Sequence, residues 1–433
     1  MSRAVQIAAA LLAALGGGAA AAETVAITGG RLHTMGAAGT IDNGTLLIRD
    51  GRIVAAGADA QVPEDARRID ASGKVVTPGL FDAHSYIGIV EISLVTETND
   101  AAQVGNHFAA AFDVADAVNP RSSLIPVNRI EGVTRVMSAP VSVVPPAGSF
   151  ARGQTISGLG AVIHLGGGED YLVRRGAAIF AELGEHGAEL AGGSRAAALT
   201  RLDEALEDAR DFAGNRPSFD SNERRGYAVG RLDLEALQDV LDREVPLVLH
   251  VNRASDIAAA LRLAGRHEIG IVVRGGAEAW IMADELAAAR VPVVLDPLAN
   301  LPQRFETLAA TLENAARLHR AGVLIAFASS DSHNARNLKQ AAGNAVAHGL
   351  PHEAALAALT INPALVYGIE DSFGTLEPGK DADVVIWSGD PFELDTFAEQ
   401  VFIRGRSVPM VSRATLLRDR YLDLDAELPP AYR

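Results

Sequence analysis

The sequence predicts an α/β protein: a (β/α)8 TIM barrel with a small β-sandwich domain that both ends of the chain build together. The first observation is a series of four strand–helix units in residues 246–350. Their strands are continuously apolar, as buried parallel strands covered by helices must be. The second is that short strands separated by Gly and Asp occur near both termini. The third is length, because residues 79–373 provide 295 positions and a typical eight-unit barrel needs about 250.

The terminal β-domain is predicted from turn signals. The segment "TLLIRDGRIVAAG" contains two apolar runs joined by Asp50-Gly51, a pair typical of a tight hairpin turn. Near the other end, "DADVVIWSGDP" and "VFIRGRSV" are again short strands punctuated by Gly and Asp. The predicted parts are a signal peptide (1–22), a composite β-domain (23–78 with 374–410), the barrel (79–373) and a C-terminal tail (411–433).

The front half of the barrel is less regular than the back half. The segments "LFDAH", "GVTRVMSAP" and "GAVIHLG" predict strands, whereas residues 170–215 predict helices with no strand between them. The eighth strand is expected within residues 141–160. In such barrels the chemistry takes place at the C-terminal ends of the strands. The residues that end the expected strands are His84, Ser138, His164, His250, Arg274, Asp296 and Asp331.

The imidazoles and carboxylates among these residues are candidate metal ligands. Neutral imidazole nitrogens and carboxylate oxygens bind Zn²⁺ and similar divalent ions. Other readings stay open: His84 could only cap its strand by hydrogen bonding, and Asp331 could be the N-cap of the following turn. The sequence contains no Gly-x-Ser-x-Gly elbow, no His-Glu-x-x-His and no phosphate-binding Gly-x-x-x-x-Gly-Lys loop, which removes the most common rival chemistries.

The N-terminus predicts export. Arg3 is followed by an apolar run from Ala4 to Leu15, and then by small residues ending at Ala20-Ala21-Ala22. This pattern is typical of a secretory signal peptide, and the apolar run is too short to span a bilayer core of about 30 Å. We therefore expect a periplasmic or secreted protein with no membrane span in its mature form. The chain contains no cysteine, so its fold depends on packing and it has no thiol chemistry.

The net charge of −16 argues against nucleic acid as a partner, because nucleic-acid binding needs clustered Lys and Arg. The same argument applies to an anionic membrane surface. The expected partner is a small-molecule substrate. The sequence leaves homo-oligomer formation open.

Two motifs give the chain a family resemblance. One is "DGRIVAAG" followed by "IDASGKVVTPGLFDAH", and the other is "ALAALTINPALVYGIEDSFGTLEPGKDADVVIWSGDP". Together they resemble the amidohydrolase superfamily, specifically its imidazolonepropionase-like exported members, over nearly the whole mature chain. The resemblance implies a barrel with a composite β-domain. It also implies hydrolysis of C–N bonds other than ordinary peptide bonds, as in cyclic amides or dipeptides.

The resemblance also implies a metal centre, which this sequence matches only in part. The family uses a His-x-His pair on the first strand, a bridging carboxylate or carbamylated Lys, two later His and a last-strand Asp. His84 matches the first ligand, His250 the fifth-strand ligand, and Asp331 lies within one residue of the last-strand Asp. Tyr86 stands where the second His is expected, and Arg274 where the sixth-strand His is expected. No Lys occurs on the middle strands, so at most a mononuclear site remains.

The sequence leaves two functions open. In the first, the protein is a hydrolase in which His84, His250 and Asp331 hold one divalent ion, with zinc as the expected metal, and Asp331 acts as general base. Arg274, Tyr86 and His164 are then the candidate substrate-binding residues, with Arg274 gripping a carboxylate. In the second, no metal is bound. The protein is then a catalytically inactive periplasmic module that binds a small molecule, or serves a structural role, on the same scaffold.

Overall fold

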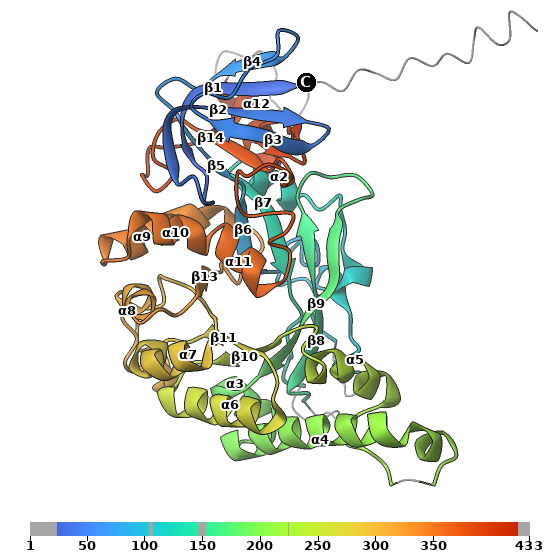
Figure 1. The fold of residues 1–433 in the computed structure, drawn as a ribbon. Coiled ribbons are helices and arrows are strands. Elements are labelled where there is room, and N and C mark those ends of the chain that lie inside the picture. The colour runs from blue at the N-terminus through green and yellow to red at the C-terminus, as the bar shows by residue number, and fades with distance from the viewer. Residues whose placement is uncertain (1–23, 104–106, 146–152, 224, 423–433) are drawn as a thin grey trace, which may run out of the picture.

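A computed structural model describes residues 24–103, 107–145, 153–223 and 225–422. The predicted signal peptide, residues 1–22, lies outside this part of the chain. The described chain forms two eight-stranded sheets, one in the upper and one in the lower part of Figure 1. The lower sheet is the barrel, and strands from both ends of the chain build the upper one. The predicted fold class is therefore confirmed.

The composite sheet joins the two ends of the chain at one strand pair. Its order is β16-β15-β14-β5-β1-β2-β3, with β4 paired to β1. Strand β5 pairs with β14 in antiparallel fashion, with Pro78 opposite Val384. The predicted hairpin is β2–β3, and both Asp50 and Gly51 adopt a positive φ, as its tight turn requires. The strands are β1 Val25–His33, β2 Thr40–Arg49, β3 Arg52–Gly57, β4 Arg67–Asp70, β5 Val75–Pro78, β14 Val384–Trp387, β15 Ala398–Ile403 and β16 Arg406–Ser407.

The barrel sheet has the order β13-β12-β11-β10-β9-β8-β7-β6. Backbone hydrogen bonds nearly close it: the Ser330 N–H donates to the His84 carbonyl (2.9 Å), and the Tyr86 N–H donates to the Asp331 carbonyl (3.1 Å). The ends of β6 and β13 are thereby held side by side. The strands are β6 Leu80–Ser85, β7 Val133–Ser138, β8 Ile156–His164, β9 Leu172–Glu182, β10 Leu247–Val251, β11 Ile271–Gly275, β12 Val293–Leu295 and β13 Ile325–Phe327.

Helices cover the outside of the barrel, and the four predicted strand–helix units are present as β10–α6, β11–α7, β12–α8 and β13–α9. In α6, Ile257, Ala260 and Leu263 are buried, which is the one-sided apolar spacing of a helix packed on a sheet. No helix of the described residues is both long and apolar enough to cross a membrane. The α-helices are α2 Leu124–Arg129, α3 Gly184–Leu190, α4 Arg195–Asp220, α5 Arg231–Leu241, α6 Ala254–His267, α7 Ala283–Ala289, α8 Asn314–Arg320, α9 Leu338–Ala347, α10 His352–Ala358, α11 Ile361–Val366 and α12 Arg413–Leu422. The 3-10 helices are η1 Thr96–Thr98, η2 Val114–Ala117, η3 Ala279–Met282, η4 Phe305–Thr307 and η5 Asn334–Asn337.

The front half of the barrel corrects two sequence expectations. Residues 170–215 are not purely helical, because β9 occupies Leu172–Glu182 before α3 begins. The eighth strand, expected within residues 141–160, is instead β9, because β8 (Ile156–His164) is the strand already predicted from "GAVIHLG". Strand β8 also runs antiparallel to both β7 and β9, so the barrel departs from eight parallel strands at this position.

A buried ion-pair group connects the barrel to the composite sheet. Arg135 on β7 is fully buried, and its guanidinium contacts Asp381 (2.6 Å) and Asp383 (3.0 Å), which precede β14. The same guanidinium lies 4.5 Å from the centre of the Phe373 ring. The two sheets are therefore held to each other by charge pairs around a fully buried arginine.

Candidate active site

A cavity of about 520 Å³ opens at the C-terminal ends of β9, β10 and β11. This volume is within the range of small-molecule sites, and its place in the barrel is where such enzymes keep their chemistry. The charged and polar residues that line it include Tyr86, Glu182, His186, His250, Asn252 and Arg274.

Three of these side chains form one hydrogen-bonded group. Glu182 Oε2 lies 2.6 Å from His250 Nδ1, and Glu182 Oε1 accepts a hydrogen bond of 3.0 Å from Arg274. The sequence brings them together because they end three neighbouring parallel strands in register: His250 is opposite Glu182 on one side and opposite Arg274 on the other. The carboxylate of Glu182 is thus held between two nitrogen donors.

Glu182 is ionised in this environment. Its side chain is only 2% exposed, and burial alone would raise its pKa. The charges of His250 and Arg274, with the hydrogen bond from His250, outweigh burial and lower the pKa of Glu182 to about 2. A carboxylate only accepts hydrogen bonds, so the proton of this contact belongs to His250 Nδ1.

The second ring nitrogen of His250, Nε2, does not contact Glu182. When Nδ1 of a neutral imidazole carries the proton, Nε2 is an acceptor. The His250 side chain is 26% exposed and lines the cavity. Its Nε2 edge faces Gly275, where an added Cβ would lie 3.0 Å from Cδ2 and 3.3 Å from Nε2. Gly275 has a φ of +88°, so this position favours glycine and leaves the ring edge free of a side chain.

His84 and Tyr86 lie beside this group and come from the end of β6. His84 is 1% exposed, and its Nδ1 has no hydrogen-bond partner among the described residues. Its ring meets Tyr86 and Phe180 edge to face, with centroids 5.4 and 5.6 Å away. Burial, and then the charge of Arg274, hold the pKa of His84 well below its ordinary value. His84 is therefore a neutral imidazole.

Asp331 adopts the capping role that the sequence left open. Its Oδ1 accepts backbone N–H groups from Ser332 (2.6 Å), His333 (2.9 Å) and Asn334 (3.1 Å). Burial acts to raise the pKa of Asp331, but the hydrogen bonds from Asn334, Ser332 and His333 outweigh it and lower the pKa. Its carboxylate organises the turn into η5. A catalytic or metal-binding role for Asp331 stays a prediction.

Glu182, His250 and Arg274 lie on the rim of the barrel, at the C-terminal ends of its parallel strands. The expectation that His164 belongs to this rim is wrong. His164 ends β8, which runs antiparallel to its neighbours, so it lies opposite Arg135 near the start of β7. Both ring nitrogens are engaged there: Nε2 with the Asp170 carbonyl (2.8 Å) and Nδ1 with the Gly166 N–H (3.1 Å). The cavity beside it is a different one, lined by residues of the composite sheet.

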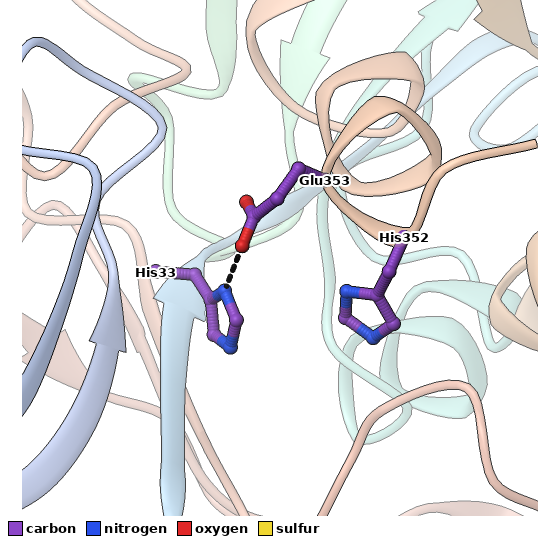
Figure 2. Close-up of side chains that lie close together, drawn as sticks. All are labelled: His33, His352 and Glu353. Atoms are coloured by element: carbon purple, nitrogen blue, oxygen red, sulfur yellow. Dashed lines mark hydrogen bonds and ion pairs between the residues drawn. The ribbon is translucent and has the colours of Figure 1, made fainter.

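The rim residues do not fit a divalent ion in their present arrangement. Only one group of three His, Asp or Glu in the described part of the chain has its ligand atoms within 4.8 Å of one another, and it lies elsewhere, at His33, His352 and Glu353 (Figure 2). At the rim, Glu182 already binds His250 and Arg274, and the Arg274 cation would repel a nearby dication. His84 Nδ1 there has no hydrogen-bond partner among the described residues, and His250 Nε2 is the ring nitrogen that Glu182 does not contact.

Sequence reasoning missed Glu182, the centre of the group. The resemblance implies a carboxylate on a middle strand, and Glu182 at the end of β9 supplies one. A usable signal was the run "AAIFAE", an apolar segment that ends in a charged residue as "PLVLH" does. The composition of this run predicts a helix, and in a helix Glu182 does not end a strand.

Sequence reasoning also missed a second carboxylate, Asp82, which binds the backbone of two segments next to the rim. It is fully buried on β6, and its Oδ1 accepts the backbone N–H groups of Ser329 (3.0 Å) and His84 (3.2 Å). Burial raises the pKa of Asp82 to about 7 against the effect of these hydrogen bonds. Asp82 thus fixes the segment after β13 to the strand that carries His84.

Comparisons with known proteins support the family resemblance. The model described as "Amidohydrolase family" matches residues 233–411. A solved amidohydrolase structure from Thermotoga maritima superposes with a TM-score of 0.79 and 27% identity, over 89% of this chain and 99% of that one. These matches support the amidohydrolase superfamily for this chain, and within that superfamily a likeness to imidazolonepropionase.

Curated relatives agree with this assignment. An imidazolonepropionase from Brucella abortus is 26% identical and covers 81% of this chain and 88% of its own length. A 5-methylthioadenosine/S-adenosylhomocysteine deaminase from Symbiobacterium thermophilum is also 26% identical and covers 84% of this chain and 85% of its own length. "Amidohydrolase tasK" from Hapsidospora irregularis is 24% identical over 80% of this chain, which spans only 37% of that protein.

Proposed function

We propose that the protein is a hydrolase that cleaves a C–N bond other than an ordinary peptide bond. Its relatives named as a deaminase and as an imidazolonepropionase act on such bonds. The observation that carries the proposal is the Glu182–His250 pair, which lines a cavity at the barrel mouth with a contact of 2.6 Å. An imidazole oriented by a carboxylate commonly acts as a general base in enzymes.

The proposed reaction uses the two ring nitrogens of His250 in different ways. Nε2 accepts a proton from a water molecule, and the water oxygen bonds to the electrophilic carbon of the substrate. Glu182 stabilises the imidazolium that forms, because it is ionised and bound to Nδ1. The C–N bond then breaks, and the imidazolium returns its proton to the leaving nitrogen.

Arg274 and Tyr86 support this reaction from the cavity wall. Arg274 keeps Glu182 in its charged form, since it donates to the other carboxylate oxygen. It also lines the cavity, where its charge favours a substrate with a carboxylate or with developing negative charge on oxygen. Burial raises the pKa of Tyr86, so its hydroxyl is a hydrogen-bond donor at neutral pH.

No step is assigned to a metal ion. Members of the family usually bind a divalent metal, and the sequence predicts one zinc ion held by His84, His250 and Asp331. These three residues do not form a compact ligand group in the described chain. The proposed reaction therefore uses only the side chains of the rim.

The second candidate function is a catalytically inactive binding module. The observation that favours it is that Tyr86 and Arg274 occupy positions where the family has metal ligands. We also propose that the protein is exported to the periplasm or beyond after removal of residues 1–22. The Arg3, apolar and Ala-rich pattern of the N-terminus supports this proposal.

The test is a turnover assay on purified mature protein. Release of ammonia or amine is measured for cyclic amides, N-acyl amino acids, dipeptides and aminopurines. For any class that reacts, His250→Ala should lower kcat by at least about 100-fold, the usual contribution of a general base. His319→Ala, which changes an exposed histidine on α8, should leave kcat as it is. Tight binding of one class without turnover would establish the binding module instead.

A further inference from the structure

A second cluster of ligand-type side chains lies outside the barrel cavity. It consists of His33, His352 and Glu353, whose ligand atoms all lie within 4.8 Å of one another. None of the three lines the cavity at the barrel mouth. We propose that this cluster binds one Zn²⁺ or similar borderline divalent ion, which ties the composite sheet to the barrel.

The ligands come from two separate parts of the fold. His33 is the last residue of β1, whereas His352 and Glu353 are the first two residues of α10. Figure 2 shows the His33 ring and the Glu353 carboxylate pointing at each other, with the His352 ring beside them. Because His33 and Glu353 are 320 positions apart in the chain, an ion between them would close a very long loop.

The distance between two of the ligand atoms is close to the distance found between ligand atoms around a bound ion. His33 Nδ1 lies 2.9 Å from Glu353 Oε1, and the ligand atoms of a tetrahedral zinc site lie about 3.3 Å apart, given bonds of about 2.0 Å. The ion would replace the proton that His33 and Glu353 now share in their hydrogen bond. The site is open on one side, since the His33 side chain is 6% exposed and that of Glu353 is 57% exposed. A water molecule can therefore complete the coordination.

The surrounding residues orient two of the ligands. Asp390 accepts hydrogen bonds from His352 Nε2 at 3.0 and 2.9 Å. A carboxylate only accepts, so Nε2 carries the proton and Nδ1 is the free donor for a metal. Carboxylate–histidine–metal arrangements of this kind are common in metal sites. Thr40 donates a hydrogen bond of 2.9 Å to Glu353 Oε1, which fixes the other anionic ligand.

The ligand types select the ion. Two imidazole nitrogens with one carboxylate oxygen suit Zn²⁺, Co²⁺, Ni²⁺ or Cu²⁺. Mg²⁺ and Ca²⁺ prefer six or more oxygen ligands, which this cluster does not offer. The Phe392 ring packs against the site and adds no metal ligand. Its centroid lies 4.8 Å from that of the His352 ring. The inferred role is structural, because the ion connects β1 to α10.

The experiment is zinc binding to the full mature chain after treatment with a chelator and dialysis. ZnCl₂ is titrated by calorimetry, and Tm is measured with and without zinc. The wild type should bind one ion per chain and gain in Tm. His352→Ala and Glu353→Gln should lose both effects, and Asp390→Asn should weaken binding about 10- to 100-fold as loss of an orienting carboxylate does. His319→Ala is the matched control and should behave as the wild type.

The same titration on His250→Ala separates this site from the rim. Binding that persists in His250→Ala and is lost in Glu353→Gln supports the proposal. Three results would overturn it: a wild type that binds no zinc at micromolar concentration, binding that is equal in the wild type and both ligand variants, or binding that is lost in His250→Ala. Glu353 is largely exposed, so its Gln variant should keep the fold and give a readable result.

Discussion

Glu182, the last residue of β9, lies opposite His250 on the neighbouring parallel strand β10, and Glu182 Oε2 meets His250 Nδ1 at 2.6 Å. This contact orients the His250 ring. Glu182 stays ionised, and Nε2 is the ring nitrogen of His250 that Glu182 does not contact. Arg274 completes the group from the next strand. A barrel that lacks two of the expected ligand histidines thus still carries an imidazole oriented by a carboxylate at its mouth.

The Glu182–Arg274 pair should contribute strongly to stability. In Glu182→Gln the buried Arg274 loses its counter-charge, and breaking a buried pair in this way costs about 3 kcal/mol of unfolding free energy or more. Denaturant unfolding followed by circular dichroism measures the loss. Glu189→Gln, on the exposed face of α3, is the matched control and should change little. Equal stability of the two variants would show that the pair contributes nothing.

The contribution of Glu182 should also depend on pH. Its pKa falls from 4.5 to about 2 on folding, so the unfolded chain binds the proton more readily. The contribution is therefore complete above about pH 4.5 and is lost as the pH falls towards 2. The measurement is the difference in unfolding free energy between wild type and Glu182→Gln at several pH values. A difference that grew on acidification would contradict the assigned charge state.

The buried Arg135 should hold the two sheets together. Arg135→Met leaves Asp383 buried without its partner, which should lower the unfolding free energy by about 3–5 kcal/mol. Arg52→Met removes an exposed arginine that contacts the same Asp381 at 3.3 Å, and should cost less than about 1 kcal/mol. Urea unfolding of the two variants tests the contrast. Similar losses in both would refute the role of burial.

Restoring the missing histidines should create a metal site at the rim. Tyr86→His with Arg274→His supplies two imidazoles next to His84 and removes the cation that repels a metal. In a Glu353→Gln background, which removes the ligand cluster at His33, this double variant should bind one zinc ion per chain. The background protein alone should bind none. Zinc bound equally by both would mean that the rim already holds a metal.

The start of the mature chain is a direct test of export. Cleavage after Ala22 should leave Glu23 as the first residue. N-terminal sequencing of protein from the periplasmic or culture fraction reads this residue. A cytoplasmic protein that still begins at Met1 would reverse the localisation.

Strong local patterns made most of the fold predictable. The Asp50-Gly51 turn and the apolar strands from β10 to β13 follow from turn chemistry and burial on both faces. Strand β9 did not, because "RRGAAIFAE" is rich in residues that favour helices. Its pairing with β8 and β10 is a tertiary effect that overrides this preference. The antiparallel direction of β8 has no local sequence signal at all.

The candidate site was predictable only where a strand was recognised. His84, His250 and Arg274 were found because each ends a clear apolar run. His164 was misplaced, because a strand end marks the catalytic rim only if the strand runs parallel to the others. Glu182 was missed together with its strand. The case of Asp331 shows that sequence alone does not distinguish a carboxylate that caps a turn from one that binds a metal.

In the proposed reaction, Glu182 and His250 promote cleavage of a C–N bond without a metal at the rim. The most direct test measures turnover of a reactive substrate and zinc content in the same sample, before and after chelation. We expect the chelator to remove the zinc held at His33 and Glu353 while turnover stays the same. Turnover that falls with the metal, and returns when zinc is added to wild type and Glu353→Gln alike, would contradict the claim.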